Sequence, residues 1–168
     1  MIVRRLLVLV VALSLALAGL AAPAGAARPI DVEDGAWTYV PDDLTPEPDK
    51  VVGQNVFISN SATGTWTATT LLAGDVTEDF VVVIHKGLHG TYQGLVTFEG
   101  VVDGKEGTLQ IKTNGSGPWP PNPEPEGDWS GSWVILSGTD DLSNLRGQGS
   151  WWGPLGNLLF DGKVHFTG

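Results

Sequence analysis

The chain has 168 residues, a formal net charge of −10 at pH 7, seven tryptophans and no cysteine. The absence of cysteine excludes disulfide bonds, thiolate catalysis and zinc–cysteine sites, so packing alone must stabilise the fold. The acidic balance argues against nucleic acids and anionic membrane surfaces as partners, because both would repel the protein.

Residues 1–26 have the pattern of a secretory signal peptide. Arg4 and Arg5 precede an uncharged run rich in Leu, Val and Ala, and small residues follow as far as Ala26. The apolar run is short for a membrane span. We therefore expect cleavage near Ala26 and a secreted, extracellular protein without a membrane anchor. Loss of the two arginines would change the net charge from −10 to −12.

Residues 27–50 form an acidic, proline-containing segment that we interpret as a lead-in to the folded domain. Its one strand candidate is residues 36–40. Trp37 and Tyr39 share a face there and would be costly to leave in water, so this strand could join the edge of a sheet.

From residue 51 to 168 the sequence predicts a single all-β domain. Strand patterns alternate with turn signals, and no window has apolar residues at helical spacing over three turns. Asp103-Gly104 is a strong hairpin signal, whereas the alternation of residues 158–166 continues through Asp161-Gly162 and predicts one long final strand. The predicted strands are residues 51–59, 65–72, 77–86, 92–102, 107–113, 128–136, 147–152 and 158–166.

Nearly every predicted strand carries aromatic or large aliphatic residues on one face and polar residues on the other. This favours an eight-stranded, mainly antiparallel β-barrel, whose interior is either filled by side chains or leaves room for one small ligand. Gly147 and Gly149 share a face of one strand and predict a bend or a close approach of two backbones.

Two segments carry a resemblance to a known family. Residues 91–107 contain a glycine, the triplet Phe98-Glu99-Gly100, an Asp-Gly turn and a further glycine, and residues 131–149 run from a tryptophan strand through Ser-Gly-Thr and Asp-Leu to Leu-Arg-Gly-Gln-Gly. Together they resemble domain-of-unknown-function family 3224, whose members are similar in fold to the allene oxide cyclase barrel. The resemblance covers residues 64–166. It implies an allene oxide cyclase-like barrel and raises an isomerase or cyclase as one activity.

The chain departs from the family pattern at two places. Asp140 stands where the family usually has glycine, and Asp tolerates a positive φ better than most residues do. A Pro-rich insertion, residues 117–127, lengthens a loop that is normally short.

The candidate ligand-binding residues are mainly aromatic. The tryptophans could be simple core residues or the walls of a cavity for an apolar ligand, with indole N–H groups as its polar points. Arg146 could close a turn by a salt bridge to Asp140 or Asp141, or it could anchor a ligand carboxylate. The full set is Trp66, Tyr92, Trp129, Trp133, Arg146 and Trp151.

Glu99 is the weak candidate for a catalytic residue. If its side chain pointed inward among aromatic rings, its pKa would be raised and would suit general acid–base chemistry. The alternatives are a solvated carboxylate on the outer face or a partner for Arg146. His85 and His89 have the spacing of a zinc pair but lack an acidic companion, and Glu124, Glu126 and Asp128 match no calcium loop. We predict no metal and no cofactor.

The sequence thus leaves three functions open. The first is a secreted barrel that binds a small apolar molecule in an aromatic-lined cavity. The second is an isomerase or cyclase that acts by orienting its substrate. The third is a structural or surface-interaction protein. A homo-oligomer is also expected, because related barrels associate.

Overall fold

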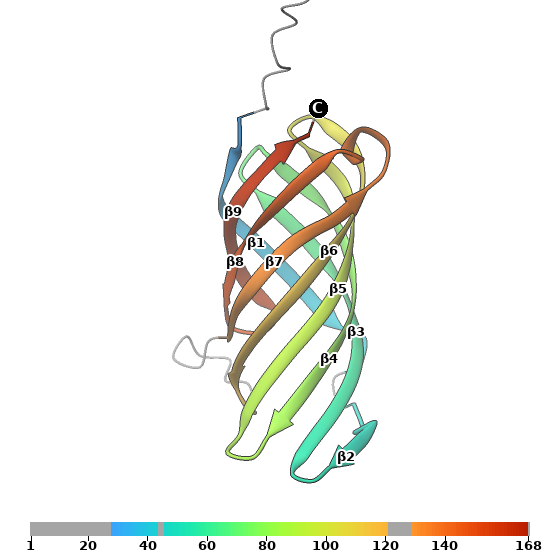
Figure 1. Ribbon diagram of the computed structural model, residues 1–168, viewed down its shortest axis with the longest axis vertical. Helices are drawn as coiled ribbons and strands as arrows, with labels where there is room; N and C mark the ends of the chain where they lie inside the picture. Colours follow the sequence, from blue (N-terminus) through green and yellow to red (C-terminus); the bar gives the residue numbers. More distant parts are fainter. Residues whose placement is uncertain (1–27, 44–45, 121–128, 168) are drawn as a thin grey trace, which may run out of the picture.

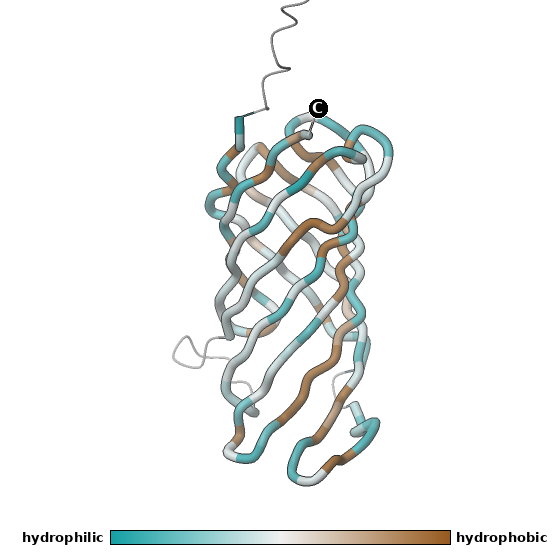
Figure 2. The backbone as a smooth tube through the Cα atoms, in the orientation of Figure 1, coloured by the Kyte–Doolittle hydropathy of each residue, from teal (hydrophilic) through white to brown (hydrophobic). Residues whose placement is uncertain are grey.

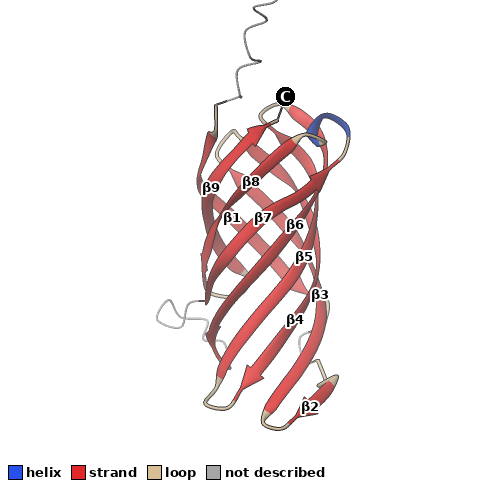
Figure 3. Ribbon diagram, viewed as in Figure 1, coloured by secondary structure: helices blue, strands red, loops and turns tan. Residues whose placement is uncertain are grey.

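The computed structural model describes residues 28–43, 46–120 and 129–167. The predicted signal peptide and most of the Pro-rich insertion lie outside the described residues. Within those ranges nearly all of the chain is strand, and the one short 3₁₀ helix, η2 (Asp140–Leu142), lies at one end of the molecule (Figure 3). No helix in the described ranges is long and apolar enough to span a membrane.

The strands form a closed antiparallel barrel (Figure 1). Each long strand pairs with the next one along the chain, and β1 pairs with both β9 and β3, so eight strands close without a free edge. The short strand β2 pairs only with β3 and lies at the lower end in Figure 1. The strands are β1 (Ile30–Pro41), β2 (Lys50–Val52), β3 (Asn55–Ala68), β4 (Leu72–His85), β5 (His89–Val102), β6 (Lys105–Pro118), β7 (Trp129–Gly138), β8 (Leu145–Gly153) and β9 (Asn157–Phe166).

The prediction of an eight-stranded antiparallel barrel is confirmed, but two of its strands differ from the predicted ones. Residues 51–59 and 65–72 were expected to form two strands; β3 instead runs through the intervening residues as one strand, and β2 ends before it. The eighth barrel strand is β1, which lies in the predicted lead-in. Trp37 of β1 faces the interior and is 1% exposed, so burial of this side chain fixes β1 in the barrel wall.

The turn predictions hold where a special backbone conformation was expected. Asp103 and Gly104 both have positive φ, 52° and 73°, as the two central residues of a tight hairpin turn require. Asp140 has φ 51°, so this aspartate does adopt the positive φ that it was expected to tolerate. Strand β9 continues through Asp161-Gly162, and the irregularity in its pairing lies on β1, between Val32 and Gly35.

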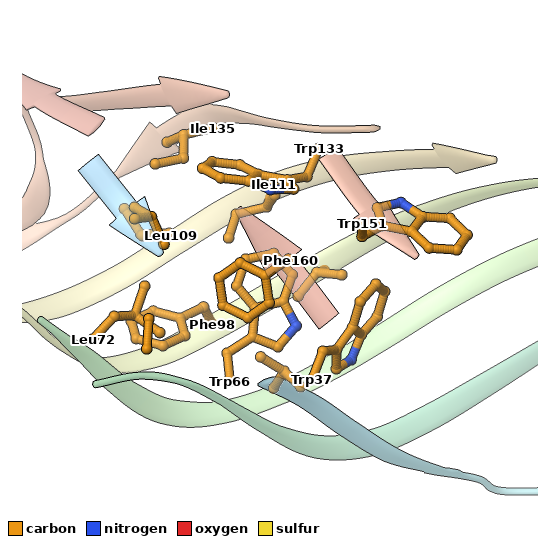
Figure 4. Packing of buried hydrophobic residues seen from close by; sticks show 14 of the residues in the cluster. Trp37, Trp66, Leu72, Phe98, Leu109, Ile111, Trp133, Ile135, Trp151 and Phe160 are labelled. Atoms are coloured by element: carbon orange, nitrogen blue, oxygen red, sulfur yellow. The ribbon is translucent and has the colours of Figure 1, made fainter. Parts of the chain in front are cut away.

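Alternation of side chains fills one end of the barrel with a dense apolar core. Figure 2 shows apolar and polar residues alternating along most strands, with a continuous apolar run in the lower part of β4. The upper end is packed by Phe98, Leu109 and Ile135, and Leu142 of η2 is fully buried there. Figure 4 shows this cluster continuing into a central layer of aromatic rings, in which Trp66 and Phe160 have ring centroids 4.8 Å apart.

The predicted close approach at Gly149 is present. A Cβ atom at this position would lie 1.8 Å from the Asp161 carbonyl oxygen and 2.6 Å from the Trp133 ring. Only glycine lets the backbone of β9 and the indole of Trp133 come so near to β8.

Candidate functional site

A cavity of about 340 Å³ occupies the other end of the barrel, at the end where β2 lies. Its size falls in the range of small-molecule sites. The wall is built mainly from inward-facing side chains of the barrel strands, together with residues of the loops at this end. Its aromatic members are Trp37, Tyr39, Phe80, Tyr92, Trp119, Trp129 and Trp151. Its aliphatic and proline members are Pro41, Pro46, Ile58, Val82, Leu155 and Leu158.

Aromatic rings of the cavity wall also pack against one another. Tyr92 and Trp151 have ring centroids 5.7 Å apart at 85°, and Trp37 and Trp151 have centroids 6.1 Å apart at 84°. Phe80 and Tyr92 are tilted by 46°, with centroids 5.7 Å apart. Edge-to-face and tilted contacts of this kind are the arrangements that aromatic pairs prefer, and they make the wall of the cavity largely apolar.

Glu78 is the one carboxylate that β4 places inside the barrel. It lies two residues before Phe80 and four before Val82, so it shares their inward face, and its side chain is only 4% exposed. The Tyr92 hydroxyl donates a hydrogen bond to Glu78 Oε1, and Thr113 Oγ1 donates to the same oxygen at 2.9 Å. Glu78 Oε2 has no hydrogen-bond partner among the described residues, so it is the oxygen available to a ligand.

Burial sets the charge state of this carboxyl group. Removal from water raises the pKa of Glu78 from its ordinary 4.5 to about 7, against the opposing effect of the hydrogen bonds from Tyr92 and Thr113. Burial, and then the nearby Glu78 charge, raises the pKa of Tyr92 well above its usual value, so Tyr92 keeps its proton and acts as a donor. Glu78 consequently changes charge near neutral pH, inside an apolar cavity.

Gly94 makes room for this cluster of Glu78, Tyr92 and Thr113. A Cβ atom at Gly94 would lie 2.2 Å from Glu78 Oε1 and 2.6 Å from both hydroxyl oxygens. Because Gly94 has no side chain, the three polar groups can share the space next to this position of β5.

The structure brings together three of the six predicted ligand-binding residues. Tyr92, Trp129 and Trp151 line the cavity. Trp66 and Trp133 face inward, as expected, but they belong to the packed layer between the cavity and the filled end. Both tryptophan alternatives, core and cavity wall, therefore occur in one barrel.

Arg146 lies at the start of β8, paired with His165, and so stands at the filled end away from the cavity. Its guanidinium donates to the carbonyl oxygens of Leu145, at 2.6 Å, and Ser143, at 3.2 Å. Among the described residues it forms no salt bridge with Asp140 or Asp141. The guanidinium lies nearer to these carbonyl oxygens than to the two carboxylates. Arg146 therefore closes the turn through hydrogen bonds to the backbone, and not through the predicted salt bridge.

Glu99 is exposed on the outer face, so it is the solvated carboxylate that was expected if its side chain did not point inward. Its neighbour Phe98 takes the inward position. His85 and His89 are paired at the ends of β4 and β5, and both ring nitrogens of His85 lie within hydrogen-bond distance of Asn55 and Thr91. Within the described ranges, no three His, Asp or Glu side chains gather as a metal site would require.

The sequence reasoning missed Glu78, Trp37 and Tyr39 as cavity residues. The signal for Glu78 was present, because strict alternation puts Glu78 on the same face of its strand as the apolar residues Phe80, Val82 and Ile84. The indole expectation holds in part. Trp129 and Trp133 donate to the carbonyl oxygens of Pro118 and Asp161. The buried indole N–H groups of Trp37, Trp66 and Trp151 have no acceptor in the described part of the chain.

Comparison with solved structures supports the fold. The chain is similar to the crystal structure of a protein of unknown function from the DUF3224 family of Shewanella oneidensis MR-1, with a TM-score of 0.57 and 14% sequence identity over 84% of this chain and 99% of that chain. At this identity the likeness concerns the fold alone. No family model and no curated protein matches the sequence. The structural neighbour thus comes from the family that residues 91–107 and 131–149 resemble, whereas the wider allene oxide cyclase-like grouping stays a prediction.

Proposed function

We propose that this protein binds one small, largely apolar molecule in the aromatic-lined cavity. The observation that carries the proposal is the cavity itself, because among the described residues the interior of the other end is packed with buried apolar side chains. A purely structural barrel gains stability by filling its interior, and an unfilled aromatic wall forgoes that gain. The proposal includes export and release outside the cell, as residues 1–26 predict.

The first test is native mass spectrometry of the protein purified gently from the medium of its own host. A discrete additional mass that is lost on denaturation is expected. The same measurement reports whether the protein is a homo-oligomer.

A second test uses a neutral probe, 4-phenylbutan-1-ol, titrated by tryptophan fluorescence. Val82 is buried in the cavity wall and the adjacent Val81 is 38% exposed on the outer face, which gives a matched pair of substitutions. Val82→Phe should narrow the cavity and weaken binding, whereas Val81→Phe should leave binding unchanged. Equal binding by both variants would place the probe elsewhere and would count against the proposal.

Glu78 supports a second candidate function, an isomerase or cyclase that uses general acid–base catalysis. A carboxyl group with a pKa of about 7 can both give and accept a proton at neutral pH, and Oε2 is the atom that would do so. The resident molecule recovered by mass spectrometry should then be converted to an isomer by the wild type and not by Glu78→Gln. An unchanged molecule after incubation with the wild type would leave binding alone as the function.

A further inference from the structure

We infer that the molecule held in this cavity is a cation, an amphiphilic amine whose ammonium group lies at Glu78 and whose apolar part lies against the aromatic wall. The inference rests on the proposed binding function and names the chemical class of the ligand. It stands on the charges of the wall, on the free oxygen of Glu78 and on the aromatic rings near that carboxyl group.

The charges of the cavity wall are all of one sign. Glu78 is the charged residue that lies in the barrel interior, and no Lys, Arg or His is present among the described lining residues. A ligand carboxylate would meet this group without any cation to pair with it, and in a site of low dielectric such repulsion is only weakly screened. The whole chain, with its net charge of −10, adds to the same field.

Glu78 presents a ready acceptor. Its Oε1 already receives two hydrogen bonds, from Tyr92 and Thr113, which hold the carboxyl group in place. Oε2 has no hydrogen-bond partner among the described residues, and Glu78 is only 4% exposed. An ammonium group is the donor that gains most at such an atom, because it offers both hydrogen bonds and the opposite charge.

One aromatic side chain contacts this carboxyl group, and two further rings lie beside that ring. Tyr92 contacts Glu78 directly, and the Tyr92 ring lies 5.7 Å from the rings of both Phe80 and Trp151, measured between centroids. Ring faces attract cations, most strongly when the cation has been removed from water. A carboxylate beside several rings therefore suits an alkylammonium group, while the rest of the wall takes an apolar chain or ring.

The test compares three probes that share one skeleton: 4-phenylbutylamine, 4-phenylbutan-1-ol and 4-phenylbutyrate. They differ in carrying an ammonium, a neutral hydroxyl or a carboxylate group. Binding is measured at pH 8 by calorimetry, where Glu78 is mostly ionised and an alkylamine of pKa about 10 is protonated. The amine should bind about tenfold more tightly than the alcohol, and the carboxylate more weakly than the alcohol.

Two variants locate the effect. Glu78→Gln should remove the tenfold advantage of the amine and leave the affinity for the alcohol within about twofold, because the shape of the wall is kept. Glu99→Gln removes a carboxylate from the outer face and should change none of the three affinities.

The outcomes separate this inference from the function on which it rests. If the alcohol binds and the amine binds no more tightly, or if the carboxylate binds best, the inference is wrong while the binding function stands. An amine advantage that survives in Glu78→Gln would also overturn the inference. If none of the three probes binds, both the inference and the binding function fail.

Discussion

The two ends of this barrel are built from the same eight strands but use their interior differently. At the upper end in Figure 1, Phe98 and Leu142 are completely buried and the side chains fill the space. At the lower end, Phe80 is only half buried and borders a cavity of about 340 Å³ with a carboxyl group in its wall. Closing the barrel therefore does not require filling it, because the packed end and the central aromatic layer supply the core.

The largest change in stability is expected from a Phe→Ala substitution at the packed end, and the same substitution at the cavity end gives the comparison. Phe98→Ala removes a fully buried ring from the packed end and should lower the free energy of unfolding by about 3–5 kcal/mol. Phe80→Ala removes a half-buried ring that already borders open space, so the loss should be only about 1 kcal/mol. Urea unfolding of both variants measures the difference. Equal losses would show that the two ends are packed alike.

The next effect concerns Glu78 of the cavity end, the one carboxyl group that is buried among the described residues. The pKa of Glu78 is raised from 4.5 to about 7 in the folded protein. Between these two pH values Glu78 is therefore mostly protonated in the folded state and mostly ionised in the unfolded state. The stability contributed by the neutral form is complete below about pH 4.5 and is lost as the pH rises through about 7, by about 3 kcal/mol in all.

Glu78→Gln cannot ionise and should lack this loss. The measurement is the free energy of unfolding of the wild type minus that of Glu78→Gln, followed from pH 4.5 to 8 so that other titrating groups cancel. The difference should fall with rising pH. A constant difference would mean that Glu78 has the same pKa in the folded and unfolded states.

A smaller change in stability is expected at Gly94, which lies against the polar cluster of Glu78, Tyr92 and Thr113. Gly94→Ala brings a methyl group within 2.2 Å of Glu78 Oε1, and the three flexible polar groups must move apart, at a cost of about 1–2 kcal/mol. The loss should be smaller when Glu78 is also replaced by alanine, because one of the crowded groups is then absent. Additive losses in this double-mutant cycle would show that Gly94 and Glu78 do not interact.

Much of the fold could be predicted from the sequence, because alternation and turn chemistry are local. The hairpin at Asp103-Gly104 and the inward tryptophans needed no knowledge of distant contacts. The predicted number of barrel strands, eight, is right although two strands differ: β3 was divided in two, and residues 36–40 of β1 were predicted only as a possible edge strand. The shared face of Trp37 and Tyr39 was a local signal for this strand, whereas its pairing with both β3 and β9 joins segments far apart in sequence.

The cavity was harder to predict than the barrel. Alternation tells which side chains face inward, but not how far along the barrel axis they lie, so Trp66 and Trp151 looked equivalent although one is core and the other wall. Glu78 was within reach of the same alternation. A charged side chain is seldom buried, and the partners that make the burial of Glu78 tolerable, Tyr92 and Thr113, come from two other strands.

The smallest expected effect lies at Arg146, which belongs to the packed end. Its hydrogen bonds to the Leu145 and Ser143 carbonyl oxygens tie the turn before β8, and Arg146→Ala should lower the free energy of unfolding by about 1 kcal/mol. Because the cavity lies at the opposite end, the affinity for 4-phenylbutan-1-ol, measured by calorimetry, should not change. Weaker binding in this variant would mean that the packed end controls the shape of the cavity, and the two ends could then no longer be treated as independent.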